Sequence, residues 1–193
     1  MMRSRAFRGP TFRGPAHRLR FALVLTAYGL ALLGLRQSPA LTAALSPLER
    51  GTAAVTEALL ERSGFEAQRT GTVISHPGGF AYEIYYPCTG LTILGFLVAG
   101  LLALPGGRGR KLAAIAAAVP ALAVANQLRL LHLFAVGVER PQAVELAHGV
   151  WEGVLLTGVV VFWLGFTRRV SGQATAPTDR NSVILGRAEA LAP

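Results

Sequence analysis

Three side chains of this sequence belong to types that cooperate in acyl transfer: the thiol of Cys88, the guanidinium of Arg129 and the imidazole of His148. A histidine can take the proton of a thiol, and the resulting thiolate can attack a peptide carbonyl carbon. An arginine can then donate hydrogen bonds to the oxyanion that develops on that carbonyl. If the fold brings the three side chains together, they can form a site for nucleophilic catalysis by cysteine.

Each of these residues also has an interpretation without chemistry. A lone cysteine in a membrane protein is most often a small apolar filler, and an arginine at a helix end can extend toward lipid head groups. Cys88 differs from a filler in its setting, because Pro87 precedes it and an apolar run begins at it. A sulfur at the N-terminus of a helix lies at the positive end of the helix dipole, which favours the thiolate.

Two polar neighbours favour a polar site over isolated residues. Asn126 lies three residues before Arg129 on the same face of a helix, which argues against a lipid-facing anchor. Glu152 lies one turn after His148, and an acid in an apolar segment is costly unless it is paired or hydrogen-bonded. We therefore expect Asn126 and Glu152 in supporting roles, with a purely structural ion pair as the alternative for Glu152.

The other histidines are weaker candidates, and neither a metal nor a cofactor is expected. His132 lies three residues after Arg129 and competes for the role of base, His76 falls in a predicted turn, and His17 belongs to a basic N-terminal segment. A single cysteine excludes an internal disulfide and a cysteine-rich zinc site. The glycine-rich stretch 106–109 lacks the following Lys-Ser/Thr of a phosphate-binding loop.

The segments that would position these side chains are too apolar for a soluble protein and indicate a membrane. Of the 193 residues, 52% are apolar and only 15% are charged, and soluble domains typically have roughly 25% charged residues. We predict an all-α integral membrane protein, with a membrane domain over residues 19–170. Four spans are predicted at about 19–35, 88–104, 112–138 and 149–166. A cleaved signal peptide is the alternative for the first span, because Ser38-Pro39-Ala40 follows it.

The charge distribution predicts which ends of the spans face the cytoplasm. The net charge is +9, and eleven of the 19 Lys and Arg residues lie in three acid-free segments, 3–20, 108–111 and 168–169. The positive-inside rule places these segments in the cytoplasm, which accounts for the charge without nucleic acid. A basic tail over 1–18 and a disordered tail over 171–193 are then both cytoplasmic.

The polar segment 36–87 is predicted to lie outside. Its 52 residues hold four arginines and five glutamates, so the segment is nearly neutral. Leucine and valine recur over 41–60 at helix-like spacing, interrupted by Pro47, which predicts amphipathic helices. The stretches 70–75 and 80–86 are rich in β-branched and aromatic residues and flank turn residues at 76–79, which predicts a small β-hairpin.

This topology brings the three candidate residues to one membrane level. Arg129 lies 18 residues after Lys111, which is about 27 Å along a helix and close to the outer boundary of a core roughly 30 Å thick. Cys88 begins the second span and His148 precedes the fourth, and both of these spans run inward from the outer side. We therefore expect Cys88, Arg129 and His148 to meet at the outer face of the membrane.

The identity and order of these residues resemble the exosortase/archaeosortase family over about residues 80–166. The resemblance rests on Cys88-Thr89-Gly90-Leu91 at the start of a span, Asn126-Gln127-Leu128-Arg129 late in the next span, and His148 at the start of the last one. The short chain is most similar to compact members such as exosortase H. It differs from many members in having Tyr86-Pro87 before the cysteine, and Thr89 where those members have serine.

The resemblance implies a sortase-like membrane cysteine endopeptidase or transpeptidase, with Cys88, Arg129 and His148 as its catalytic residues. Its substrates would be exported proteins that carry a C-terminal motif, a transmembrane helix and a basic cluster. They would be processed at the outer face of the cytoplasmic (inner) membrane, whose lipid is the other expected partner. The alternative is a non-enzymatic scaffold or assembly subunit, in which Arg129, His148 and Glu152 only pair helices.

Overall fold

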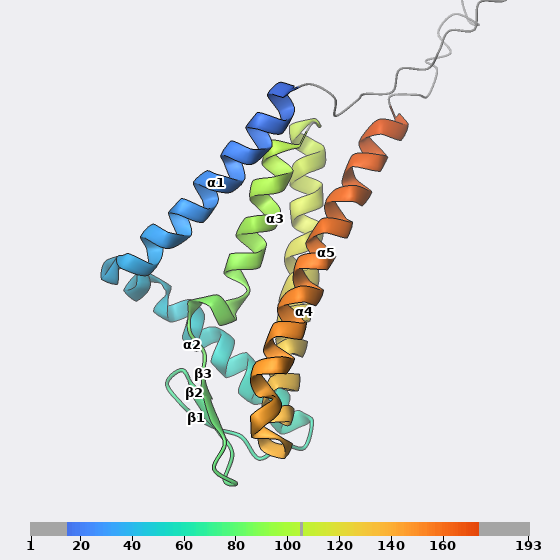
Figure 1. Cartoon of the computed structure of the whole chain (residues 1–193). Helices are drawn as coiled ribbons and strands as arrows, with labels where there is room; N and C mark the ends of the chain where they lie inside the picture. The colour runs from blue at the N-terminus through green and yellow to red at the C-terminus, as the bar shows by residue number, and fades with distance from the viewer. Residues whose placement is uncertain (1–14, 105, 174–193) are drawn as a thin grey trace, which may run out of the picture.

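The computed structural model describes residues 15–104 and 106–173. Most of these residues are helical, and a small sheet lies at one end of the molecule (Figure 1). Of the predicted basic tail, residues 1–14 lie outside the described part, and the remainder belongs to helix α1 (Pro15–Gln37). Of the predicted C-terminal tail, 171–173 continue helix α5 (Val144–Gln173), and 174–193 lie outside the described part.

Four helices form the apolar half of the molecule: α1, α3 (Leu91–Ala103), α4 (Arg108–Glu139) and α5. Helix α3 packs against the other three. The indole N–H of Trp163 on α5 donates to the carbonyl of Leu97 at 3.0 Å, and the hydroxyl of Tyr28 on α1 donates to the carbonyl of Thr92 at 2.5 Å. A Cβ atom at Gly100 would overlap the Trp163 ring, so glycine there permits close packing of α3 on α5.

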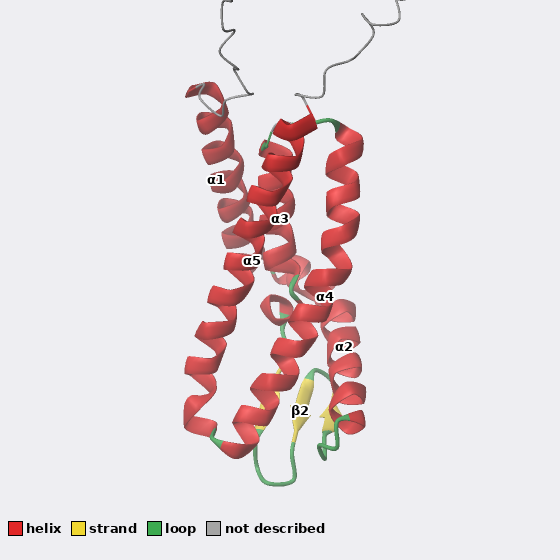
Figure 2. Cartoon of the chain, turned by 90° about the vertical axis from the view of Figure 1, so that its right-hand side faces the viewer, coloured by secondary structure: helices red, strands yellow, loops and turns green. Residues whose placement is uncertain are grey.

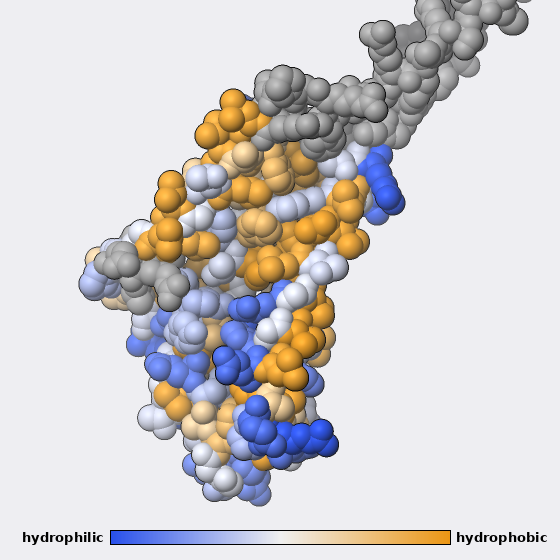
Figure 3. Space-filling model, in the orientation of Figure 1, coloured by the Kyte–Doolittle hydropathy of each residue, from blue (hydrophilic) through white to orange (hydrophobic). Residues whose placement is uncertain are grey.

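Two helical segments are long and apolar enough to cross a membrane, α4 and the stretch Pro141–Arg169 that contains most of α5. Only 22% of the most apolar window of each is buried, whereas the core helix of a soluble protein would be mostly buried. Shorter apolar helical stretches cover Leu19–Gly34 and Leu91–Ala103. On the face shown in Figure 3, hydrophobic residues predominate over the half that contains these helices, and hydrophilic residues are most frequent at the other end.

The polar end contains helix α2 (Pro39–Arg62) and three short strands, β1 (Gln68–Thr70), β2 (Val73–Ser75) and β3 (Ala81–Glu83). The strands form an antiparallel sheet in the order β1-β2-β3. Strand β1 was not predicted. Ile74 of β2 pairs with Tyr82 of β3, and the side chain of Ile74 is buried with those of Ile84, Leu60 on α2 and Phe134 on α4. This apolar cluster joins the sheet and α2 to the end of α4.

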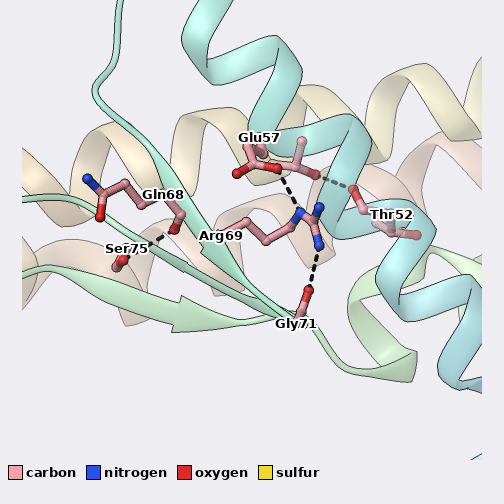
Figure 4. Close-up of polar contacts among 7 residues, drawn as sticks. Thr52, Glu57, Gln68, Arg69, Gly71 and Ser75 are labelled. Atoms are coloured by element: carbon pink, nitrogen blue, oxygen red, sulfur yellow. Dashed lines mark hydrogen bonds and ion pairs between the residues drawn. The ribbon is translucent and has the colours of Figure 1, made fainter.

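Polar contacts connect the sheet to α2, and α2 to α4. The Nε atom of Arg69 on β1 donates to the Glu57 carboxylate at 2.7 Å, and its Nη1 atom donates to the carbonyl of Gly71 at 3.1 Å (Figure 4). The hydroxyl of Thr56, fully buried on α2, lies 2.8 Å from Oε1 of Gln127 on α4. Helix α2 is therefore held from both sides.

The helices differ from the prediction at Pro47 and at the starts of α4 and α5. Helix α2 is continuous through Pro47, where the sequence predicted an interruption. Proline deprives the carbonyl four residues earlier of its bond, but Ala43 is exposed, so this carbonyl is not trapped in a dry core. Helix α4 begins at Arg108 and α5 at Val144, each earlier than its apolar run, because helical hydrogen bonding continues into the polar ends. The turn η2 (Pro141–Ala143) joins them as antiparallel neighbours (Figure 2).

The start of the second apolar helix also differs from the prediction. Helix α3 begins at Leu91, and Cys88 belongs to a preceding 3₁₀ turn, η1 (Tyr86–Thr89). The N–H of Cys88 donates to the carbonyl of Tyr85 at 2.7 Å. Gly90 then adopts a left-handed conformation with a φ of 80°, which interrupts the helical path and favours glycine. Cys88 therefore lies in a connection between the sheet and α3 rather than at the first residue of a span.

Candidate active site

Arg129 and His148 meet between the two long helices. The Nη2 atom of Arg129 on α4 lies 3.2 Å from the Nε2 atom of His148 on α5. Arg129 is 4% exposed, so the guanidinium is nearly removed from solvent. Because a guanidinium can only donate, Nε2 accepts this hydrogen bond and the proton of a neutral His148 lies on Nδ1. The antiparallel packing of α4 and α5 through η2 creates this contact.

Asn126 connects the same face of α4 to the segment that contains the thiol. Its Nδ2 atom donates to the carbonyl of Cys88 at 2.8 Å. The side chain of Asn126 is 3% exposed and packs against Gly90, where a Cβ atom would lie 3.2 Å from Asn126 Cγ. The Asn126 amide therefore positions η1 next to α4, one helical turn before Arg129.

The Cys88 thiol is partly buried beside the apolar cluster of the polar end. Burial raises the pKa of the Cys88 thiol, whereas a backbone hydrogen bond at Tyr85 and the positive charge of Arg129 act to lower this pKa. The sequence led us to expect a helix dipole that favours the thiolate, and this expectation is wrong on balance, because desolvation of the sulfur is the larger effect. A reaction through this sulfur would therefore need a base to remove the proton.

Tyr82 lies in the same electrostatic environment. Its hydroxyl donates to the carbonyl of Leu130 on α4 at 3.4 Å. Burial raises the pKa of Tyr82, and Cys88 and Arg129 are both close enough to influence that pKa. Tyr82 could not be singled out from the sequence, where its one signal is its place in a strand-like aromatic stretch.

Two glutamates flank His148 along α5. Glu152 follows by one turn, with a carboxylate oxygen 3.7 Å from His148 Nε2. Glu145, three residues before His148, lines an open cavity of about 480 Å³ together with His148, Phe80 and Tyr82. Glu145 was not among the residues predicted for the site, although its spacing of three residues from His148 on one helix could have indicated it. The cavity offers space for a peptide next to the imidazole.

The two other described histidines have different partners. The Nδ1 atom of His132 accepts a hydrogen bond from the Trp151 indole at 3.0 Å. The Nδ1 atom of His76 accepts one from the backbone N–H of Gly78 at 3.0 Å, and its ring packs against Phe134. His17 lies among residues whose side chains are not described. Within the described ranges, no group of three or more His, Cys, Asp or Glu residues could hold a metal ion.

The family model for transmembrane exosortases (Exosortase_EpsH) matches residues 11–167, a range that includes Cys88, Arg129 and His148. No curated protein matches the chain, and no solved structure matches it. Because the matched range covers most of the 193 residues and the helices that carry the buried polar contacts, the chain belongs to the transmembrane exosortase family.

Proposed function

We propose that the protein is a cysteine endopeptidase or transpeptidase that cleaves C-terminal sorting signals of exported proteins at the outer face of the cytoplasmic membrane. The 3.2 Å contact between Arg129 and His148 carries the proposal. This contact lies one helical turn from Asn126, whose amide holds the Cys88 segment. Family membership supports a sortase-like membrane function in general.

The proposed reaction begins when His148 takes the proton of the Cys88 thiol. The sulfur attacks the scissile carbonyl carbon, and the tetrahedral intermediate collapses with cleavage of the C–N bond. His148 returns the proton to the leaving amine, which leaves a thioester on Cys88. Water or an acceptor amine then attacks the thioester, His148 takes the proton of that nucleophile, and the free thiol is restored.

Arg129 is the proposed donor to the oxyanion. Its Nε atom is buried and has no hydrogen-bond partner in the described part of the chain. An unpartnered buried donor is costly to keep, so a substrate oxygen that accepts its hydrogen bond would relieve this cost. As that contact forms, the guanidinium can release His148 Nε2, whose lone pair is then free to accept the proton of the thiol.

The proposed topology has four spans, α1, α3, α4 and α5, with both termini in the cytoplasm. Asn126 lies 18 residues after Arg108, the first residue of α4, which corresponds to about 27 Å along the helix. The hydrogen bond from Asn126 to Cys88 brings the sulfur-bearing segment to the same level. This level is near the outer boundary of a hydrocarbon core roughly 30 Å thick.

The proposed substrate presents its scissile bond just outside its own transmembrane helix, with its basic cluster at the cytoplasmic side. The open cavity beside His148 would take the residues around that bond, and Phe80, Tyr82 and Glu145 would set the motif preference. Strand β3 pairs with β2 on one side only in the described sheet. Its other edge can therefore pair with an extended peptide and lead the peptide toward Cys88.

The test is processing in cells that coexpress the protein and an exported reporter with such a C-terminal signal, read by reporter size and release. Cys88→Ala and His148→Ala should abolish processing while the protein still inserts into the membrane. His132→Ala is the matched control, because His132 is an exposed histidine of α4 that bonds Trp151, and it should process normally. Normal processing by a well-inserted Cys88→Ala protein would end the cysteine-enzyme hypothesis.

A scaffold function is the second candidate, because the Arg129–His148 bond also joins α4 to α5. In that case, Arg129 and His148 variants would lower thermal stability, and Cys88→Ala would leave every cellular phenotype unchanged. The proposed enzyme gives the opposite result for Cys88→Ala, so one variant separates the two functions.

A further inference from the structure

A second cavity lies at the end of the bundle opposite the candidate active site. It occupies about 390 Å³ between the first turns of α4 and the last turns of α5. Small residues of α4, among them Ala113 and Ala117, and the rings of Phe162 and Phe166 on α5 form its apolar wall. Arg110 precedes this wall on α4 and Arg169 follows it on α5, so both arginines lie toward the same end of the bundle.

The two arginines have no acidic counterpart there. The sequence contains no Asp or Glu over 105–118 or 160–173. Neither Arg110 nor Arg169 has an ion pair with the carboxylates that the structure describes. In the proposed topology, this end of the bundle is at the cytoplasmic surface of the membrane. The cavity therefore combines an apolar wall at the depth of the lipid tails with two unpaired cations at the depth of the head groups.

We propose that this cavity binds an anionic phospholipid, with part of an acyl chain against the alanines and phenylalanines and the phosphate between Arg110 and Arg169. Guanidinium groups bind phosphate oxygens through paired N–H donors. Basic pockets between transmembrane helices on the cytoplasmic side bind acidic head groups for the same reason. The apolar wall and the cations together select a charged lipid over a zwitterionic lipid.

The charge of the cavity also argues against a protein occupant. The sorting signal of the proposed substrate places a basic cluster at this membrane surface, and Arg110 and Arg169 repel such a cluster. A second copy of the chain would bring its own acid-free basic segments, 108–111 and 168–169, to the same level. An anionic lipid is the occupant whose charge is complementary.

The experiment uses the full-length protein in a neutral detergent and measures lipid binding by native mass spectrometry. The probes are phosphatidylglycerol and phosphatidylcholine with the same acyl chains. Wild-type protein should retain phosphatidylglycerol in preference to phosphatidylcholine. The Arg110→Gln/Arg169→Gln protein should bind phosphatidylglycerol about 25-fold more weakly, since each arginine near the surface contributes about a factor of five.

The matched control is Arg108→Gln/Arg168→Gln, which removes the same charge from the same two helix ends but from residues outside the cavity wall. It should keep the preference. An equal loss in this control would overturn the proposal in favour of general surface attraction. Ala117→Trp fills the cavity without a change in charge and should also weaken phosphatidylglycerol binding, and unchanged binding would place the lipid elsewhere.

Two further probes separate the lipid from other sources of phosphate and from the substrate. Glycerol phosphate at millimolar concentration should not displace phosphatidylglycerol, because it lacks the acyl chain; full displacement would identify a free phosphate site and overturn the proposal. A peptide of the substrate's transmembrane helix and basic cluster should bind without displacing the lipid, and displacement would make the cavity a substrate site. The position of the cavity at the cytoplasmic surface rests on the proposed topology, but none of these measurements depends on catalysis, so they can fail or succeed independently of the proposed cleavage reaction.

Discussion

The partial burial of the Cys88 thiol predicts how its rate of alkylation depends on pH. Because burial raises its pKa, the thiolate fraction at a given pH is smaller in the folded protein than in the denatured chain. The rate of alkylation by iodoacetamide should therefore rise with pH around a midpoint above that of the denatured protein. Arg129→Gln should move this midpoint further up, because the Arg129 charge lowers the pKa.

Mass spectrometry can follow this reaction without ambiguity, since Cys88 is the only cysteine of the chain. The denatured protein supplies the reference midpoint under the same buffer and detergent conditions. A folded-state midpoint at or below that reference would contradict the burial described for the thiol.

For Arg129, we predict that processing needs the planar shape of the guanidinium and not only its positive charge. Arg129→Lys keeps the cation but loses the planar set of donors that reaches His148 and leaves Nε for the substrate. Loss of one oxyanion donor lowers kcat by about 100-fold or more, and we expect at least this loss in the processing assay. Arg140→Lys, an exposed substitution just after the same helix, should process at the wild-type rate. Equal rates for the two variants would show that the reaction does not need the planar donors of Arg129.

At the scale of residues, the sequence predicted part of the site. The spacing of Asn126 and Arg129 on one helix face requires only helical periodicity, so their common side could be predicted. Their hydrogen-bond partners could not be predicted, because the bond from Asn126 to the Cys88 carbonyl depends on a 3₁₀ turn. The position of Tyr82 depends on a sheet that packs against Phe134, far away in sequence.

At the scale of elements, the backbone at the junction between η1 and α3 predicts the effect of a substitution at Gly90. Gly90 has a left-handed backbone, and a Cβ atom there would lie 3.2 Å from the Asn126 side chain. Gly90→Ala should therefore introduce a strain of about 1–2 kcal/mol and shift Cys88 away from α4. We expect a lower midpoint of thermal unfolding and slower processing.

Gly107→Ala is the control for this substitution, because Gly107 has a negative φ and a Cβ atom there meets nothing within 4 Å. It should leave both stability and processing unchanged. If Gly90→Ala behaves like Gly107→Ala in both measurements, the junction does not set the position of the thiol.

The apolar runs predicted where helices form but not where they begin. Helices α4 and α5 extend beyond their apolar runs, since hydrogen bonding within a helix does not require apolar side chains. Strand β1 escaped prediction because Gln68, Arg69 and Thr70 show no apolar alternation. Its place depends on tertiary contacts, chiefly the ion pair of Arg69 with Glu57 on α2.

At the scale of the whole molecule, the proposed four-span topology predicts which side of the membrane each loop faces. The segment with Gly107 should face the cytoplasm and the loop with Gly64, between α2 and β1, should face outward. Reporter fusions at Gly107 and Gly64 that are active only on one side of the membrane should therefore give opposite results. The same result from both fusions would contradict the proposed depth of the site.

The proposed common depth of the site residues also predicts that cleavage depends on the distance between the scissile bond and the substrate's membrane helix. Insertion of four residues between the recognition motif and the transmembrane helix of the substrate moves the scissile bond by about 13 Å if the insert is extended. This distance is far outside the range for attack by the thiol, so processing should fall to background. An insertion of the same length before the motif is the control. Normal processing of the first insertion would show that the motif alone determines cleavage.

The apolar cluster at the polar end has a consequence for the order of biosynthesis. Ile74 comes from the sheet and Ile84 follows its last strand, but Phe134, the ring against which they are buried, comes from α4, 60 residues after Ile74 and 50 after Ile84. A ribosome therefore delivers α2 and the sheet before the helix that completes their core. If α4 spans the membrane as proposed, the segment with α2 and the sheet stays incompletely packed until α4 has inserted, and insertion of α4 is then the last step in the folding of this polar end.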